Sequence, residues 1–397
     1  MDTTDCCIAG GGPGGMLLAL LLARRGVQVV LLEGQADFER DFRGNTLSPA
    51  ALDMLEELGL AEAVLALRHA KIPRFAVATA SGPVTFADFT RLRSRHPYIV
   101  MLPQAAFLGL LAEQLHRLPN VRLLMRAKVR ELIVDAGTVR GVRYQVDGET
   151  HELRATLTVG ADGRFSTVRK LAGLVLQPGT APIDVLWFRL PRRPDDPIDA
   201  EALFRFGHGA LLALMDHGDS WQVGYIMAKN GYRQLCEGGF AAFQRNIADV
   251  VPELAGRMQE LTGWQDCALL PVESSRLKRW YQSGLLLIGD AAHVMSPVGG
   301  VGINCALLDA DAAARVLTKP LLAGRVTQAH LRMVQRQREW PTRLIQAAQH
   351  FAHRQVVDGA LASTGPFDIP AYIRLALQFP LLRELPARLI GFGGIRG

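Results

Sequence analysis

Three short stretches of the chain hold residue types that bind nucleotide cofactors: clustered glycines, and single carboxylates at the ends of apolar runs. In the first, Gly10, Gly12 and Gly15 have G-x-G-x-x-G spacing, and Glu33 closes the next apolar run. The glycines allow the backbone to approach a pyrophosphate at a helix N-terminus, and the carboxylate accepts hydrogen bonds from a ribose diol. The alternative is a glycine-rich turn without function. We interpret the pattern as a dinucleotide-binding loop.

A second stretch follows the apolar run 153–159 and reads Gly160-Ala-Asp162-Gly163 up to Arg169. It places a carboxylate and free N–H groups where a strand ends and a helix begins, which suits a nucleotide. The alternative is an Asp-Gly turn in which Ser166 caps the helix. Both interpretations stay open at the level of sequence.

The third stretch runs from Gly289 to Asn304 and joins a buried strand, Asp290, a loop rich in glycine and a helix beginning near Ile303. The N–H groups of this helix start can stabilise negative charge that develops on a reduced ring. His293 lies within the turn, either as an acid or base or as a structural hydrogen-bonding group.

The elements that must position these residues alternate in type. An apolar strand at 6–9, an apolar helix at 16–25 and a strand ending at Glu33 predict a βαβ unit. A helix at 104–118 and strands near 121–125, 128–134 and 139–146 continue the pattern. We expect an α/β fold with a Rossmann-like dinucleotide-binding domain.

The remaining segments have residue patterns that predict other types of secondary structure. Residues 75–89 predict a hairpin, and 186–270 predict antiparallel sheet with an aromatic face followed by helices at 240–250 and 252–261. The aromatic face either covers a substrate cavity or simply fills a core. After 310 the chain is helical, and we expect it to wrap the back of the molecule. Residues 369–392 either dock onto the core or lie at a membrane interface.

Composition limits the class of protein. The 397 residues are 49% hydrophobic, with a net charge of +6 from arginines scattered along the chain. The sequence contains neither a basic run nor a nucleic-acid-binding module, so we expect no nucleic-acid partner. The five cysteines are odd in number and widely spaced, which indicates free thiols, no metal site and a cytoplasmic location. Neither a signal peptide nor a transmembrane segment is expected.

Taken together and in this order, the three stretches resemble the FAD-dependent aromatic hydroxylase family, typified by para-hydroxybenzoate hydroxylase. The resemblance implies tightly bound FAD. It places the pyrophosphate on the loop made by Gly10, Gly12, Pro13, Gly14 and Gly15, and the adenosine ribose on Glu33. Gly34 departs from the family pattern, since many relatives carry a basic residue there.

The resemblance also implies further cofactor contacts. Arg43 and Gln104 would contact the flavin nucleotide, although on spacing alone Arg43 is equally well read as a solvated loop arginine. Val129 would lie beside the adenine, and Asp162 would serve both FAD and NAD(P)H. Asp290 would bind the ribityl chain. The loop that borders the isoalloxazine would comprise Pro297, Gly299, Gly300, Gly302, Ile303 and Asn304. No catalytic acid or base is assigned, and Pro297, Gly299 and Gly300 are the best candidates for residues beside the reacting ring.

The implied reaction uses transiently bound NADPH or NADH to reduce FAD. O2 then forms a C4a-hydroperoxyflavin that hydroxylates a small aromatic or polycyclic substrate. Alternatives are a related flavoenzyme without oxygen insertion (an oxidase, reductase or halogenase) and a non-enzymatic flavin sensor. The sequence lacks the Trp-x-Trp-x-Ile-Pro segment of halogenases and any appended interaction module.

The predicted FAD-binding domain comprises residues 1–70, 100–175 and 280–350. The substrate domain, with mixed or antiparallel sheet, is inserted as 71–99 and 176–279, and 351–397 form C-terminal helices. We expect a monomer or homodimer.

Overall fold

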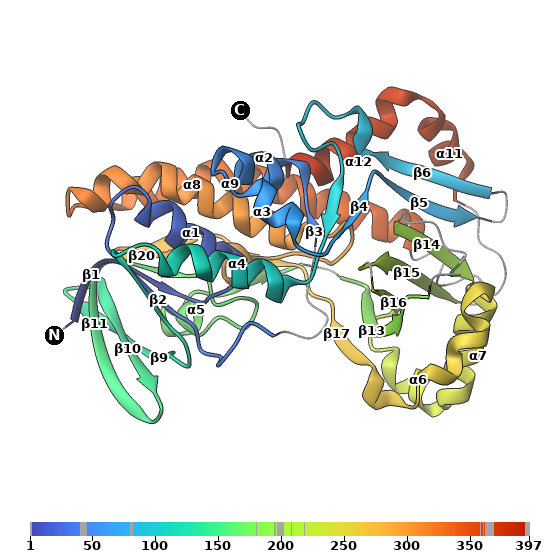
Figure 1. Cartoon of the computed structure of the whole chain (residues 1–397), viewed down its shortest axis with the longest axis horizontal. Coiled ribbons are helices and arrows are strands. Elements are labelled where there is room, and N and C mark those ends of the chain that lie inside the picture. The colour runs from blue at the N-terminus through green and yellow to red at the C-terminus, as the bar shows by residue number, and fades with distance from the viewer. Residues whose placement is uncertain are drawn as a thin grey trace.

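The computed structural model describes residues 2–39, 46–79, 82–179, 181–193, 196, 202–207, 209–217, 219–357, 359, 361 and 369–393. Two large sheets dominate the fold and lie at opposite ends of its long axis, bridged by the long helices α8 (Gly302–Leu322) and α9 (Gln328–Ala352) (Figure 1).

The first sheet has eight strands, and its central pairs are parallel. β1 (Asp2–Ala9) lies between β2 (Val29–Leu32) and β11 (Glu149–Gly160), β8 (Val121–Leu124) pairs with β2, and β20 (Leu285–Leu287) pairs with β11. The outer strands are β19 (Tyr281–Gln282), β9 (Lys128–Asp135) and β10 (Thr138–Val146). The carboxyl ends of β1, β2, β11 and β20 therefore meet at one edge, where α/β sheets bind ligands.

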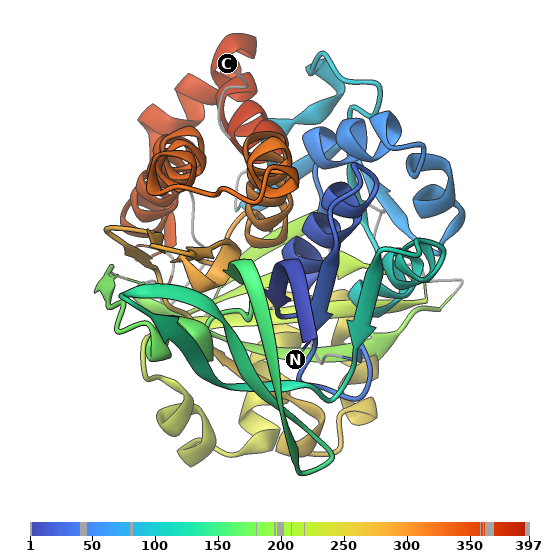
Figure 2. The same cartoon turned by 90° about the vertical axis from the view of Figure 1, so that its left-hand side faces the viewer.

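This sheet is the middle of three layers. Cys6 and Ile8 face the helices α1 (Pro13–Ala23), α4 (Gln104–His116) and α8, whereas Cys7 and Val30 face the β9–β10 hairpin. Figure 2 shows the orange helices above the strands and the green hairpin below. Every residue of α1 after Pro13 is buried, which confirms that this helix is packed on several sides. The Rossmann-like expectation is thus confirmed.

The second sheet has seven strands in the order β17-β13-β16-β15-β14-β5-β6. The predicted hairpin at 75–89 forms one edge of this sheet as β5 and β6. It joins the sheet because β5 pairs parallel with β14, although more than a hundred residues separate the two strands. The bounds are β5 (Arg74–Thr79), β6 (Gly82–Asp88), β13 (Ile183–Pro191), β14 (Ala202–Gly207), β15 (Ala210–Asp216), β16 (Ser220–Ala228) and β17 (Ala268–Pro271).

One face of the second sheet packs on helices. Leu212, Leu214 and Val223 contact the core beneath α7 (Phe240–Val250) and α6 (Tyr232–Glu237). The expected helix at 252–261 is a 3₁₀ helix, η2 (Pro252–Glu260), rather than an α-helix. The opposite face, with Trp187, Leu211 and Ala213, lines a cavity.

Short elements complete the fold. One small sheet joins β3 (Thr46–Leu47), β7 (Ile99–Met101) and β4 (Ala70–Ile72), and another joins β12 (Leu176–Pro178), β18 (Ser275–Leu277) and β21 (His293–Val294). The short helices are α2 (Pro49–Glu57), α3 (Ala61–Ala66), α5 (Thr167–Leu171), the 3₁₀ turns η1 (Phe89–Arg91), η3 (Trp264–Asp266) and η4 (Gly289–Ala291), and the π-helical turn η5 (His353–Val357).

The C-terminal helices α11 (Ala371–Gln378) and α12 (Pro380–Phe392) pack against β6 at the second sheet, and Ile373, Leu377 and Leu389 line the cavity. The expectation that the end of the chain wraps the back of the molecule was wrong in this respect, because the apolar faces of these helices cover the cavity. Within the described ranges, no helix has the length and apolar character to cross a membrane. The division into domains at the predicted boundaries stays a prediction.

Candidate functional site: a cavity from the glycine loop to the second sheet

A single cavity of about 1180 Å³ begins at the carboxyl edge of the parallel strands and continues between the two sheets. It is larger than the ~300–1,000 Å³ typical of one small-molecule site. Its first part is lined by the glycine loop and the ends of β2, β11 and β20, and its second part by the aromatic face of the second sheet. One extended cofactor and a substrate can therefore share it.

In the glycine loop, Gly10 and Gly15 allow close backbone packing, whereas Gly12 leaves open space on the cavity side. Gly10 has φ +109°, and a Cβ on it would lie 2.4 Å from the Ala161 carbonyl oxygen. A Cβ on Gly15 would lie 2.0 Å from the Gly10 oxygen, whereas one on Gly12 would meet no atom within 4 Å. Gly12 is the N-cap of α1 and lines the cavity, as do Pro13 and Gly14. The loop therefore offers an open cradle of the size that a phosphate group requires at a helix N-terminus.

Glu33 ends β2 and is almost fully buried beside this loop. Its Oε2 accepts a hydrogen bond from the Gly11 N–H (2.7 Å) and its Oε1 one from the Gln35 N–H (2.8 Å). These bonds fix the carboxylate at the cavity wall, which Glu33 itself lines. The position suits an acceptor for a ribose diol.

Basic side chains missed by the sequence reasoning lie next to Gly34. A Cβ on Gly34 would lie 3.3 Å from Cγ of Lys128, so the stem of this lysine fills the space that a larger residue 34 would need. Lys128 and Arg130 both line this end of the cavity, as do the predicted contacts Val129 and Gln104. Two basic side chains of β9 therefore line the cavity, and the stem of Lys128 lies against Gly34.

Asp162 and Ser166 cap the N-terminus of α5. Ser166 Oγ donates to Asp162 Oδ1, the Val168 N–H donates to Asp162 Oδ2 (3.0 Å), and Ser166 Oγ accepts from the Arg169 N–H (2.9 Å). Both side chains therefore stabilise the start of α5, as the capping interpretation requires. Asp162 also lines the cavity, so its predicted role toward the cofactor stays a prediction.

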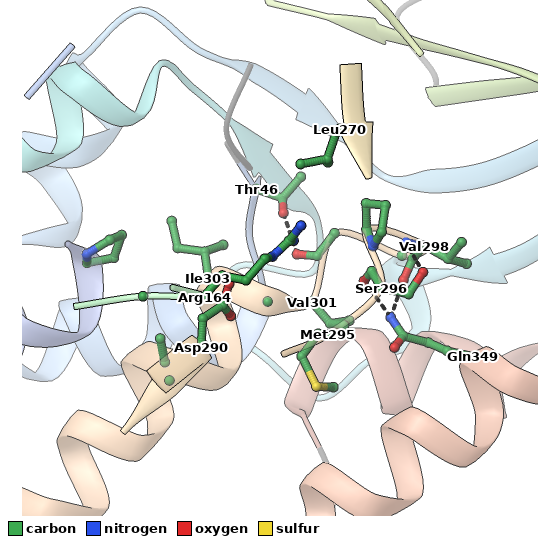
Figure 3. Close-up of a pocket in the computed structure, with 18 of the residues that line it drawn as sticks. Thr46, Arg164, Leu270, Asp290, Met295, Ser296, Val298, Val301, Ile303 and Gln349 are labelled. Atoms are coloured by element: carbon green, nitrogen blue, oxygen red, sulfur yellow. Dashed lines mark hydrogen bonds between the residues drawn. The ribbon is translucent and has the colours of Figure 1, made fainter. Parts of the chain in front are cut away.

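Arg164, in the same turn, was not singled out from the sequence. It lines the cavity, and its Nη1 donates to the Pro271 carbonyl (2.9 Å) at the end of β17. This bond joins the first sheet's edge to the second sheet. Arg164 lines the same cavity as Asp290 on η4 and Ile303 on the first turn of α8, and Figure 3 labels all three.

The loop after β21 has its carbonyl groups tied back into the protein. Gln349 Nε2 donates to the carbonyls of Ser296 (2.8 Å) and Val298 (2.7 Å), as the dashed lines in Figure 3 mark. Thr46 Oγ1 donates to the Gly300 carbonyl (2.6 Å) from the other side. The Gly300 N–H donates to the Pro297 carbonyl (2.9 Å), and Gly299 at φ +82° allows this tight turn.

Asn304 takes part in the same tethering. Its Nδ2 donates to the carbonyls of Thr46 (3.1 Å) and Gly300 (3.2 Å), and its Oδ1 accepts from the Ser48 N–H (2.8 Å). The side chain is buried and does not line the cavity, unlike Pro297, Gly299, Gly300, Gly302 and Ile303. The first N–H groups of α8, which precede its i to i−4 hydrogen bonds, are left to face a ligand.

Two other predicted contacts are not among the cavity-lining residues that the structure describes. Gly15 does not line it and instead permits the close approach of α1 to Gly10. Arg43 lies outside the described residues.

His293 is a structural residue. It is buried, and its Nε2 lies 2.6 Å from Asp309 Oδ2, while Asp309 Oδ1 accepts from Arg338 Nε (2.8 Å). The pKa of the Asp309 carboxyl is lowered: burial alone would raise it, but the charges and hydrogen bonds of His293 and Arg338 outweigh burial. Asp309 Oδ2 also accepts from the Gly289 N–H (2.9 Å). The network therefore fixes the turn that carries Asp290.

The five cysteines are free, and the described residues contain no cluster of three or more metal-binding side chains. Burial raises the pKa of the Cys7 and Cys305 thiols to about 12. These thiols are therefore inert at neutral pH.

Comparison with known proteins agrees with this geometry. A family model described as FAD binding domain matches residues 3–348. The chain is similar to 6-methylpretetramide 4-monooxygenase of Streptomyces rimosus, with 37% identity over 320 residues that cover 80% of this chain and 76% of that protein. It is also similar to para-nitrophenol 4-monooxygenase of Pseudomonas sp. (strain WBC-3), with 28% identity over 344 residues that cover 83% and 81%.

Among solved structures, PqsL of Pseudomonas aeruginosa, described as a probable FAD-dependent monooxygenase, superimposes with a TM-score of 0.78 and 23% identity over 90% of this chain and 97% of that one. At this identity the likeness concerns the fold. The curated relatives named above insert oxygen, so the halogenase alternative is less supported than hydroxylation. The glycine cradle, the buried Glu33, the cavity-facing start of α8 and these similarities identify the chain as a member of the FAD-dependent aromatic hydroxylase family.

Proposed function

We propose that this FAD-dependent monooxygenase hydroxylates a polycyclic aromatic compound, with NADPH or NADH as a transient electron donor. The observation that carries the proposal is the continuity of the cavity, which leads from the glycine loop past Pro297 to the aromatic face of the second sheet. The similarity to a protein named for its action on 6-methylpretetramide supports a substrate of several fused rings.

In this proposal the chain's residues hold FAD along the strand edge. The cradle at Gly12 takes the pyrophosphate, Glu33 the ribose, and Lys128 and Arg130 add positive charge at the same end. Asp290 binds the ribityl chain, and the tethered loop with the first N–H groups of α8 faces the ring. FAD, when bound, supplies electron transfer from NAD(P)H and activation of O2.

The protein's remaining contribution is orientation and exclusion of water. The second half of the cavity is lined mainly by apolar side chains of both the sheet and the C-terminal helices, such as Phe204, Ile226 and Leu389. A dry, shaped site favours transfer of oxygen to a correctly placed ring. The oligomeric state, monomer or homodimer, and the cytoplasmic location stay predictions.

The test is incubation of the purified, FAD-loaded protein with NADPH or NADH and ¹⁸O2, using 6-methylpretetramide and, as a single-ring comparison, para-nitrophenol. We expect one ¹⁸O atom in the polycyclic product, with NAD(P)H consumed in step. Peroxide release with an oxidised substrate that lacks ¹⁸O would favour an oxidase. Hydroxylation of para-nitrophenol alone would contradict the polycyclic substrate class.

A further inference from the structure

The cavity face of the second sheet carries two buried ring nitrogens, Trp187 Nε1 and His217 Nε2, that have no hydrogen-bond partner among the described residues. On β15 the residues at alternate positions, Leu211, Ala213 and Met215, line the cavity, and His217 continues this series just after the strand ends. On β13 the cavity-facing series contains Trp187. The other cavity-lining residues of β13, β15 and β16 are apolar except Gln222.

His217 is 4% exposed, and its Nε2 has no hydrogen-bond partner among the described residues. The pKa of His217 is lowered to about 4, first by burial and then by the charge of Arg189, with Asp219 opposing. The ring is therefore neutral at physiological pH and carries one N–H donor and one acceptor. None of the cofactor contacts proposed above involves the His217 ring.

Trp187 is 8% exposed, and its Nε1 likewise has no partner in the described part of the chain. Its ring lies over Gly224 on β16, where a Cβ would come within 2.7 Å of the six-membered ring. The ring carbons nearest to Gly224 are Cζ3, Cη2 and Cε3, so the contact with β16 does not involve Nε1. Buried tryptophan N–H groups usually find an acceptor, so this donor calls for a ligand.

The sheet register gives the spacing of the two groups. Trp187 pairs with Gly224 and Gly224 pairs with Ala213, so these three residues share one rung. His217 lies four residues further along and two strands away, and its N–H donates to the Ser220 carbonyl, which continues the antiparallel pairing. From the rise per residue and the strand spacing, the two side chains start about 16 Å apart. A single aromatic ring is too short to reach both.

We propose that Trp187 and His217 bind oxygen atoms at opposite ends of an elongated, planar, fused-ring substrate. Trp187 donates to a carbonyl or hydroxyl oxygen, and His217 exchanges a hydrogen bond with a hydroxyl or carbonyl group. This inference rests on the proposed function, because it assigns the substrate anchors of the same cavity. It also explains why the two ring nitrogens are buried without a partner in the described part of the chain: a bound ligand would accept or donate the missing hydrogen bonds.

The test measures binding to the FAD-loaded protein through the change in flavin absorbance. The probes are 2,6-dihydroxyanthraquinone, with a hydroxyl at each end, and anthraquinone, which lacks both. We expect His217→Leu and Trp187→Phe each to weaken binding of the dihydroxy probe about tenfold, as expected for losing a buried hydrogen bond, and to leave anthraquinone binding unchanged. His217→Gln, which keeps a hydrogen-bonding amide, should recover part of the loss.

Met215→Leu is the matched control, since Met215 lines the same face between the two anchors but offers no strong hydrogen bond. It should leave the affinity for both probes unchanged. Thermal unfolding of each variant checks that it folds. The inference is overturned if wild-type protein binds the dihydroxy probe no better than anthraquinone, or binds neither.

It is also overturned if both anchor variants bind the dihydroxy probe like the wild type, which would indicate that water satisfies the two groups. Incorporation of ¹⁸O into a polycyclic substrate by wild-type protein, combined with unaffected variants, would leave the proposed function standing and remove only the anchors. If no polycyclic substrate takes up ¹⁸O but the anchor variants still bind the dihydroxy probe more weakly, the proposed function is removed and the two anchors stand.

Discussion

A comparison of Gly12→Ala with Gly15→Ala separates the two roles of the glycine loop. At Gly15 the added methyl would lie 2.0 Å from the Gly10 carbonyl oxygen, so backbone must move. Overpacking of this kind costs about 1–3 kcal/mol, and each kcal/mol lowers the melting temperature by about 2–4 °C in a domain of about 150–250 residues and by less in a larger cooperative unit. We therefore expect Gly15→Ala to melt several degrees below the wild type even without FAD.

Gly12→Ala should behave in the opposite way. Gly12 has φ −75° and ψ 177°, which alanine adopts freely, and the methyl meets no atom within 4 Å. The apoprotein should thus melt at the wild-type temperature or slightly above it, because alanine restricts the unfolded chain. The methyl would, however, stand where the pyrophosphate approaches. Loss of a hydrogen bond to a charged group, about 1.5–3 kcal/mol, corresponds to FAD binding weakened roughly ten- to hundredfold.

The assay is thermal unfolding of apoprotein together with fluorescence titration by FAD. The reasoning is refuted if the two apoproteins melt at the same reduced temperature, or if Gly12→Ala binds FAD with the wild-type dissociation constant.

Three further predictions concern the surroundings of the cofactor. Gln349→Leu removes both donors from the tethered loop, so the free energy of unfolding should fall by about 2 kcal/mol and FAD binding should weaken. Gln346→Leu removes the donors to the Ser275 and Val294 carbonyls, and the acceptor for Arg276 Nη1, away from the cavity, and should cost at least as much stability without changing FAD affinity. Lys128→Ala should raise the FAD dissociation constant a few-fold, more at low than at high salt. Asp309→Asn should lower the free energy of unfolding at pH 7 by about 3–5 kcal/mol, because it leaves a buried arginine unpaired.

The Asp309 prediction has a pH signature. The folded pKa lies below the unfolded value of 3.8, so this contribution to stability is complete above that pH and is lost as the pH falls through the lower, folded value. Urea unfolding between pH 5 and pH 2.5 should therefore show an acid-dependent loss in the wild type that Asp309→Asn lacks. Equal acid sensitivity of the two proteins would contradict the assignment. Equal FAD affinity in the two glutamine variants would contradict the role of the loop, and an unchanged salt response in Lys128→Ala would contradict that of the lysine.

The sequence predicts the cofactor half of the fold well because local signals specify it. Apolar runs that end in glycines and a carboxylate identify β1, α1 and β2 directly. These signals lie within a few residues of one another and depend on backbone geometry alone.

The residues that complete the site have no such local signal. Thr46 and Gln349 are ordinary polar residues in their own segments, and only the fold brings them to the loop at 296–300. Lys128 lies against Gly34 from a different strand. An amphipathic pattern predicts that α11 and α12 have an apolar face, but it cannot specify that the face covers a cavity.

The same holds for Trp187 and His217. Alternation on their strands predicts two faces, and most aromatic residues on them do fill the core, as the alternative interpretation held. Only burial without a hydrogen-bond partner distinguishes these two side chains, and that property is visible in three dimensions alone.

The tethered loop also constrains the order in which the protein matures. Thr46 and Gly300 lie 254 positions apart, and Gln349 follows Ser296 by 53 positions. During synthesis the ribosome must therefore release α9 before the last two carbonyl tethers can form. FAD that reaches the nascent chain earlier meets a loop that lacks these tethers, so the complete cofactor site exists only after residue 349 has left the ribosome.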